Sequence, residues 1–460
     1  MAYLLFMLAN AALFVRPSEL FPSLGNIQLY MAFIVPAMLC NLQGLQNQLR
    51  PRTLIQQPIN LCMLGMVFAV PVSLIVSNMF VSAALDGAIM LAKIAVYYFM
   101  LVSLITTPQR LRQLLLVTAI CSTVTVAVSI VDFQAFKSHW EGHPDLVTQL
   151  EEDRKGDFED RVLIHAVELD HIDALGNGVY RFRMRGLGIF NDPNDVAVLI
   201  AVVLMICMYF LTDVSLSGVR FLWLIPMVIL ATGYVMTQSR GGLLSIGAAS
   251  LVWLTMRYGK KVAITLGVLG AMAAPVVLGR AAAMNISDGS GQERVQIWGD
   301  GLASLLTSKF LTGIGKDYFD EVAGHVAHNS YVHAFVELGL IGGTIFFGCF
   351  FFPILAFYRI KRYGMASVHR ELNRMTPFIA GILAAWCVGM ASLSRCYVPS
   401  TYMIVGLCAA FINLAGFYQP QPYPIVKLSS HTLRYWSICS VCLLASSIAF
   451  VRLFARYGGS

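Results

Sequence analysis

Repeated apolar runs are the feature of this sequence that most restricts how the chain can fold. About thirteen runs, each roughly 15–25 residues long, could cross the hydrocarbon core of a bilayer as a helix. Only 12% of the residues are charged, about half the share found in soluble domains. Lipid offers the backbone no hydrogen-bond partners, and the runs lack the alternation of barrel strands, so each is predicted to be helical. We therefore expect an all-α, polytopic transmembrane bundle of about 12–13 spans.

Two long polar segments interrupt the apolar runs. The first, 137–185, has an acid-rich portion and a basic end that contains Arg185. The second, 281–331, collects Arg, His, Asn and Tyr side chains for which packing between two spans gives no reason. The predicted parts are N-terminal helices 1–136, an extracytoplasmic loop 137–185, central helices 186–280, a second extracytoplasmic loop 281–331 with the candidate catalytic residues, and C-terminal helices 332–460.

Basic residues in the short loops predict the orientation of the chain. They fall on every second loop, and positive charge in short loops marks the cytoplasmic side. The N-terminus is then cytoplasmic, and both long polar segments face outward together with the turns near 16–22, 238–241 and 394–400. The positive charges behind the net charge of +7 are thus distributed according to the side of the membrane, so we expect no nucleic-acid partner.

Arg240 lies in a turn that leaves almost no loop between two predicted spans. An arginine this close to the hydrocarbon edge is costly unless it is paired or solvated. It could be a snorkelling interface anchor. It could also bind an anion, because a guanidinium presents two parallel donors to phosphate oxygens and the adjacent glycines allow close backbone approach.

Glu293, Arg294 and Trp298 form a second candidate group on a predicted short helix. Arg294 and Trp298 are four residues apart and therefore share one helix face. An arginine stacked on an interfacial tryptophan would explain the pair without any site. The acidic neighbour and the Gly/Ser-rich approach favour a site.

His328, Asn329 and Tyr331 stand where the next span begins. Histidine is the natural proton acceptor at neutral pH, although an interfacial histidine is also commonly structural. With His325 and His333 it could suggest a metal site. No thiolate pair or His-Glu-x-x-His pattern accompanies these residues, so we expect no metal and no other cofactor.

Two further polar groups have ordinary structural interpretations. Asn191 and Asn194 flank Asp192 and Pro193, and this composition is typical of a helix start. Their predicted place on the outer face leaves a role in substrate binding open. Asp86 and Lys93 lie inside one span, where a structural pair or a snorkelling lysine is favoured over an ion pathway.

Taken together and in order, these stretches resemble the O-antigen ligase and polymerase superfamily of membrane glycosyltransferases. The resemblance is strongest from Gly186 to Gly343. The segments that carry it are Arg16–Pro17, Gly188–Asn194, Ser239–Gly241, Glu293–Trp298, Gly313–Gly315, His328–Tyr331 and Glu337–Gly339.

The resemblance implies a metal-independent, inverting enzyme of the bacterial inner membrane. Such an enzyme takes a glycan from an undecaprenyl-diphosphate carrier at the outer face and transfers it to a glycan or lipid acceptor. Arg240 and Arg294 would clamp the diphosphate leaving group, and His328 would accept the proton of the attacking hydroxyl. The residues expected to bind substrate are Asn329, Tyr331, Trp298, Glu293, Asn191, Asn194 and Arg185.

Three alternatives stay open. The enzyme could be a polymerase of lipid-linked repeats and not a ligase, because both need the same donor chemistry. A transporter of lipid-linked sugars would show repeated groups of spans and polar side chains across the membrane, which this sequence does not suggest. A scaffolding protein would make the Arg and His collection incidental. The long 137–185 segment and a thirteenth span, against twelve typical of the family, are departures from the family pattern.

Overall fold

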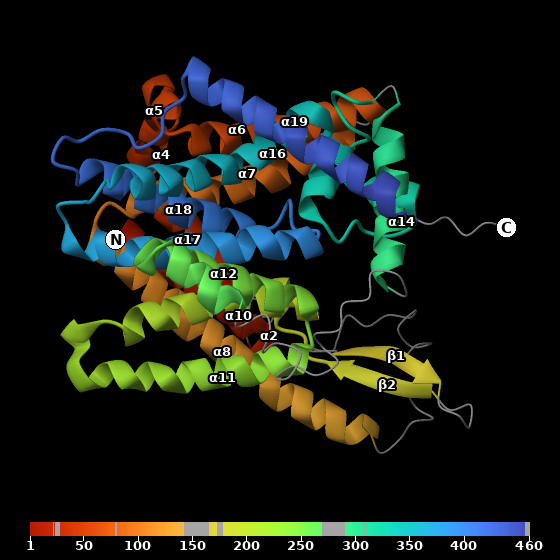
Figure 1. Ribbon diagram of the computed structural model, residues 1–460, viewed down its shortest axis with the longest axis horizontal. Helices are drawn as coiled ribbons and strands as arrows, with labels where there is room; N and C mark the ends of the chain where they lie inside the picture. The colour runs from red at the N-terminus through yellow and green to blue at the C-terminus, as the bar shows by residue number, and fades with distance from the viewer. Residues whose placement is uncertain are drawn as a thin grey trace. The chain divides into compact units, whose positions relative to one another are not determined.

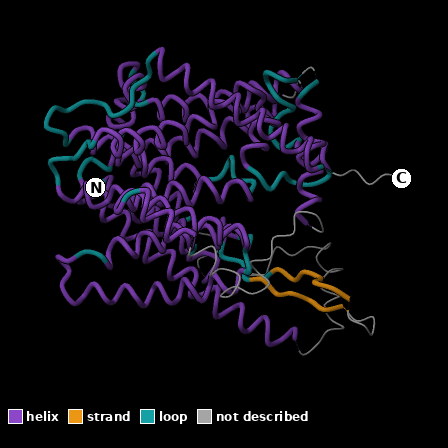
Figure 2. Tube along the Cα trace, viewed as in Figure 1, coloured by secondary structure: helices purple, strands orange, loops and turns teal. Residues whose placement is uncertain are grey.

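The computed structural model describes residues 1–21, 23, 28–78, 81–141, 165–172, 178–268, 290–307 and 309–455. Within this part of the chain helices dominate, and the strands form a single two-stranded hairpin (Figures 1 and 2). Nine of the described helices are long and apolar enough to cross a membrane. Leu29–Leu39 and Leu42–Gln48, bent by 76°, make a tenth if they form one span. The predicted all-α polytopic bundle is confirmed.

The other three predicted spans have no place among these ten. The first run forms α1 (Ala2–Val15), which at 14 residues is shorter than a span requires. The run at 243–256 lies in α12 (Arg240–Tyr258), which falls outside the group of nine. The run at 262–278 begins in a helix at 260–268 and then passes beyond the described residues. The number of spans therefore stays a prediction.

The chain forms two compact units. The first consists mainly of Tyr3–Ala37 and Arg112–Ala249, and the second mainly of Met38–Leu111 and Ser250–Ser460.

The first unit is built around α10 (Pro193–Leu211), whose side chains are almost all buried. Asp192 caps this helix by accepting the N–H of Asn194 at 2.7 Å, as the sequence predicts. Pro193 suits the first turn because it lacks the N–H that would have no partner within the helix there. Around α10 the unit contains α8 (Pro108–Glu141), α11 (Leu224–Thr237) and the hairpin of β1 (Ala166–Ile172) and β2 (Gly178–Arg183). The strands pair antiparallel with Ala166 opposite Arg183.

An ion pair between a half-buried arginine and a buried carboxylate lies in the first unit. Arg112 of α8 lies 2.7 Å from the carboxylate of Asp213, whose side chain is 6% exposed. The same carboxylate accepts the backbone N–H of Ser215 at 3.0 Å and its hydroxyl at 2.7 Å. Because its oxygens are bonded this fully, burial of the Asp213 carboxylate is tolerated.

The second unit is built around the long helix α16 (Ser330–Tyr363). It packs against α6 (Pro58–Asn78), and α6 packs in turn against α7 (Val81–Leu104) (Figure 1). The other contacts of α16 are with α14 (Ser290–Leu305), α15 (Phe319–Ala323), α17 (Arg370–Gly389), α18 (Pro399–Phe417) and α19 (Ser430–Phe454).

α16 is interrupted at Gly339, whose φ of 68° and ψ of −172° are not helical. The interruption frees backbone groups on both sides, and segment 309–315 bonds to them. Ile314 and Gly315 donate to the carbonyls of Val336 and Glu337, each at 3.0 Å. On the other side, the N–H groups of residues 340 and 341 donate to the carbonyls of residues 310 and 311 at 2.9 and 3.2 Å. These four backbone groups would form two helical hydrogen bonds, from residue 340 to 336 and from 341 to 337, and they instead form four bonds to another segment.

Glycine is required on both sides of this junction. Gly313 (φ 78°) and Gly339 have conformations that L side chains rarely adopt. A Cβ at Gly313 would overlap the carbonyl group of Glu337, and a Cβ at Gly339 would overlap the backbone of Gly313 and Leu311. The Gly313–Gly315 and Glu337–Gly339 motifs are therefore two sides of one backbone contact.

We predict that Gly313→Ala destabilises the protein by about 2 kcal/mol or more, because neither backbone can move away without losing hydrogen bonds. The melting temperature in detergent measures the loss. Gly247→Ala is the matched control, since a Cβ at that helical position meets no atom within 4 Å. Equal melting temperatures for the two variants would contradict the prediction.

Candidate active site

The turn between α11 and α12 fixes the position of Arg240. Gln238 closes α11 in the left-handed conformation (φ 50°), and α12 begins at Arg240, whose side chain is exposed. Ser239 is buried and acts as a cap, because its hydroxyl accepts the N–H of Gly242 at 3.1 Å. The same hydroxyl donates to Asn194 Oδ1 at 2.7 Å. Arg240 therefore projects from a helix start that is tied to α10.

Arg183, at the end of β2, completes this network. Its Nη2 donates to Asn194 Oδ1 at 3.0 Å and its Nε donates to the carbonyl of Thr237 at 3.0 Å. The Asn194 side chain thus organises the turn that carries Arg240, and contact with substrate stays a prediction. The sequence analysis did not select Arg183, although its place in the basic end of the 137–185 segment was a signal.

A histidine that the sequence analysis did not select anchors the neighbouring Arg185. The Arg185 backbone N–H donates to His165 Nδ1 at 3.0 Å, so Nε2 carries the ring proton and donates to Asp132 Oδ2 at 3.0 Å. Burial lowers the pKa of His165, Asp132 opposes that shift, and the charge of Arg185 adds to it. The imidazole is therefore a neutral link between α8 and the chain that leads into α10. Asn191 is exposed just before that helix.

His165 predicts a pH dependence of stability. Because its pKa is lowered in the folded chain, the unfolded chain binds a proton at higher pH than the folded one does. The stability that neutral His165 contributes is present above its ordinary pKa of about 6.5 and is lost as pH falls through the lowered value. We expect the melting temperature in detergent to fall below about pH 6.5, and to fall less in His165→Gln.

The control for this prediction is His431→Gln, because His431 is exposed. This variant should keep the wild-type dependence. If His165→Gln had the same dependence as wild type, His165 would not be the titrating group.

In the second unit, α14 carries Glu293, Arg294 and Trp298. Glu293 is exposed, whereas Arg294 is half-buried on the face it shares with Trp298. The indole Nε1 of Trp298 donates to the carbonyl of Ala327 at 2.5 Å, and its ring centroid lies 6.2 Å from that of Phe450 on α19. Trp298 therefore ties α14 to the residue directly before His328.

His328 is held between two fixed neighbours. Ala327 on one side is completely buried, and Asn329 on the other caps α16 by accepting the N–H groups of Tyr331 and Val332 at 3.0 and 3.3 Å. His328 itself is half-buried and has a left-handed φ of 47°, which is uncommon outside glycine. Such conformations persist only where the surroundings enforce them, and they cluster at functional sites.

The hydroxyl of Tyr331 is hydrogen-bonded within the helical bundle. Its hydroxyl donates to the carbonyl of Cys387 at 2.9 Å, and its ring packs against Phe346 and Phe350 with centroids 6.3 Å apart in both cases. The geometry gives Tyr331 and Asn329 structural roles, and their contact with substrate stays a prediction.

The loop between α17 and α18 joins this helix start. The Ser330 hydroxyl donates to the carbonyl of Leu393 at 2.6 Å and accepts the N–H of Arg395 at 2.9 Å, and the Cys396 thiol donates to the Ser330 carbonyl at 2.9 Å. The sequence analysis did not select Arg395. Its sequence position could have drawn attention to it, because it is a basic residue in a short loop predicted to face outward, whereas basic residues are usually enriched in cytoplasmic loops.

A buried polar cluster lies two turns further along α16. Glu337 is completely buried, with Oε1 3.0 Å from His333 Nε2 and Oε2 accepting the Tyr397 hydroxyl at 2.8 Å. The backbone N–H of Phe319 also donates to Oε1, at 3.4 Å. These partners offset the cost of burying the carboxylate and connect α16 to α15 and to the loop that carries Arg395.

The structure thus defines two groups of candidate residues. Arg183, Asn194 and Arg240 are connected in the first unit, and Arg294 and His328 are connected through Trp298 in the second. The convergence of Arg240 with the second group stays a prediction. In the described part of the chain, no three His, Cys, Asp or Glu side chains come together as metal ligands. Metal independence of the reaction also stays a prediction.

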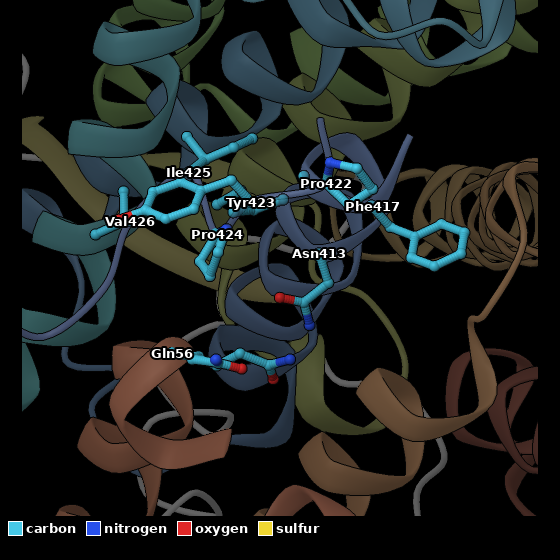
Figure 3. Close-up of a pocket in the computed structure, with 11 residues that line it drawn as sticks. Gln56, Asn413, Phe417, Pro422, Tyr423, Pro424, Ile425 and Val426 are labelled. Atoms are coloured by element: carbon cyan, nitrogen blue, oxygen red, sulfur yellow. The ribbon is translucent and has the colours of Figure 1, made fainter. Parts of the chain in front are cut away.

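A separate pocket of about 310 Å³ lies at the far end of the second unit's helices (Figure 3). It lies at the C-terminal end of α18, whereas the loop with Arg395 precedes the N-terminal end, and the 19 residues of α18 span about 28 Å. Gln56, Asn413 and the 422–426 segment line it, no charged side chain does, and Phe417 points away from the other labelled side chains. This pocket is distinct from the candidate site.

Comparison with known proteins supports the resemblance. Residues 225–347 match the family model described as O-antigen ligase. No curated protein matches the chain. The match places this region in the O-antigen ligase superfamily, and the matched stretch contains Arg240, Arg294, His328 and the Gly339 junction. The match to this region and the apolar helices support a membrane enzyme of the O-antigen ligase or polymerase type.

Proposed function

We propose that this protein transfers a glycan from an undecaprenyl-diphosphate carrier to an acceptor hydroxyl, as an O-antigen ligase does, at the outer face of the bacterial inner membrane. The observation that carries the proposal is the Trp298–Ala327 hydrogen bond, which links the helix of Arg294 to the residue before His328. It supports the proposal because it joins α14, which carries a cation, to the residue next to a potential proton acceptor, just before the start of α16.

The chemistry that these residues would perform is nucleophilic substitution at the anomeric carbon. The acceptor oxygen forms the new bond to that carbon from the face opposite the diphosphate, while the bond from the carbon to the phosphate oxygen breaks. The acceptor proton passes to the imidazole of His328 and later to solvent. Negative charge develops on the departing undecaprenyl diphosphate, and the guanidinium groups of Arg240 and Arg294 stabilise it.

Contacts within the second unit support the proposed orientation. At the end of α6, the Ser77 hydroxyl bonds to the carbonyl of Gly313. At the opposite end, Leu428 N–H donates to the Ile55 carbonyl at 2.8 Å and Arg359 Nη1 donates to the Ile425 carbonyl at 2.9 Å. Each contact joins segments that the charge pattern places on the same side, and the basic segments share the end opposite His328.

A polymerase of lipid-linked repeats would use the same donor chemistry with another lipid-linked unit as acceptor. A deletion strain separates the two functions. Full-length chains that remain on the carrier lipid indicate a lost ligase, whereas single-repeat glycan on the surface indicates a lost polymerase.

We predict that Arg240→Ala, Arg294→Ala and His328→Ala each lower transfer at least about a hundredfold, because each removes charge stabilisation or proton transfer at the reacting bond. The measurement is transfer by purified protein reconstituted with a defined undecaprenyl-diphosphate oligosaccharide. EDTA is present, because we propose that no metal takes part.

Arg370→Ala and His431→Ala are controls of the same residue types, since both side chains are exposed and lie in segments of the predicted cytoplasmic side. They should transfer at the wild-type rate. Wild-type transfer by the three site variants would disprove the site assignment, and loss of wild-type activity in EDTA that one metal restores would disprove metal independence.

Trp298→Phe separates positioning from substrate binding. The variant keeps an aromatic ring but loses the N–H that donates to Ala327, so His328 loses one of its fixed neighbours. We expect kcat to fall about tenfold, the equivalent of one hydrogen bond to the backbone, with KM within about twofold of wild type. A raised KM with unchanged kcat would instead show that Trp298 binds substrate, as the sequence analysis proposed.

A further inference from the structure

Lys316 is a nearly buried cation whose partners do not fully account for its burial. Its side chain is 10% exposed. Its ammonium bonds to the carboxylate of Asp317, the next residue, and lies 5.5 Å from the centroid of the Tyr397 ring. A buried ammonium is costly unless it is paired. Here the paired carboxylate is itself 73% exposed, so the counter-charge of Lys316 stands largely in solvent.

The buried carboxylate of the same region is already occupied. Glu337 binds His333 through one oxygen and the Tyr397 hydroxyl through the other. Tyr397 therefore separates two charges, with its hydroxyl on Glu337 and the face of its ring toward Lys316. The cation–π contact holds the ammonium but provides no negative charge.

The residue directly before Lys316 is hydrogen-bonded to another segment, whereas the backbone of Asp317 is strained. Gly315, directly before Lys316, donates to the Glu337 carbonyl at the α16 junction, so the lysine projects from a fixed segment. Asp317 has a left-handed φ of 66°, and its side chain reaches back to the adjacent residue. The cation is therefore fixed, while the anion that covers it can turn into solvent.

We propose that Lys316 binds a phosphate oxyanion of the lipid carrier, and that Asp317 occupies the ammonium until that ligand arrives. This inference rests on the proposed function, because it names a further residue of the same donor site. A diphosphate carries more charge than a carboxylate and displaces it by exchange, without any covalent step. Lysine binds phosphate as a point charge, which suits a contact made beside the arginine clamp.

Binding of undecaprenyl diphosphate without sugar tests the inference independently of transfer. Affinity is measured in detergent for wild type, Lys316→Gln, Lys316→Arg and Asp317→Asn, with the uncharged alcohol undecaprenol as the ligand that lacks phosphate. Lys260→Gln, at an exposed position, is the control.

We expect Lys316→Gln to weaken binding of undecaprenyl diphosphate about tenfold or more, and Lys316→Arg to retain most of it. Asp317→Asn should tighten binding a few-fold, about the effect of removing one exposed competing charge. Binding of undecaprenol should be the same in every variant. Melting temperatures show whether each variant is folded.

Wild-type affinity in folded Lys316→Gln would overturn the inference, as would weaker binding in Asp317→Asn. An equal loss of undecaprenol binding in Lys316→Gln would overturn the assignment to the carrier phosphates. If Lys316-dependent binding is found but wild type performs no transfer, the proposed function fails and this site stands. If transfer is found and Lys316→Gln binds normally, only this inference fails.

Discussion

The interruption of α16 at Gly339 is the constraint on which the second unit depends. A break in a buried helix frees backbone donors and acceptors that water does not reach, so other parts of the protein must supply the partners. Segment 309–315 supplies four hydrogen bonds, and it can approach closely enough only because Gly313 and Gly339 lack side chains. This one contact fixes the backbone at Gly315, directly before Lys316, and it orders the turn of α16 that carries Glu337.

The start of α16 gathers the remaining parts of the candidate site in the second unit. Asn329 satisfies the first turn of the helix, Ser330 bonds to the loop that carries Arg395, and the peptide before His328 accepts from Trp298. These contacts join segments separated by tens of residues. Substituting the residues that make them would therefore affect the orientation of His328 as well as local stability.

Local patterns predicted much of this structure, whereas pairings distant in sequence were not accessible. Apolar length predicted the helical bundle, and the Asp192–Pro193 sequence predicted the start of α10. The Glu337–Tyr397 bond spans 60 residues and the Ser239–Asn194 bond spans 45, and neither has a periodic signal. Asn194 was selected as a binding residue for its type, but only tertiary structure shows that its oxygen accepts from Ser239 and Arg183.

The packing of α14 has a consequence for how substrate reaches the site. Val295 and Ile297 are buried in one apolar cluster with Val332 of α16 and Leu444 of α19, and Gln292 bonds to the backbone end of α19. Each such side chain contributes about 1.5–3 kcal/mol when fully buried, so lifting α14 away would expose several at once. Arg294 and His328 therefore move as one body. We therefore expect α14 to be a fixed wall of the candidate site and not a lid.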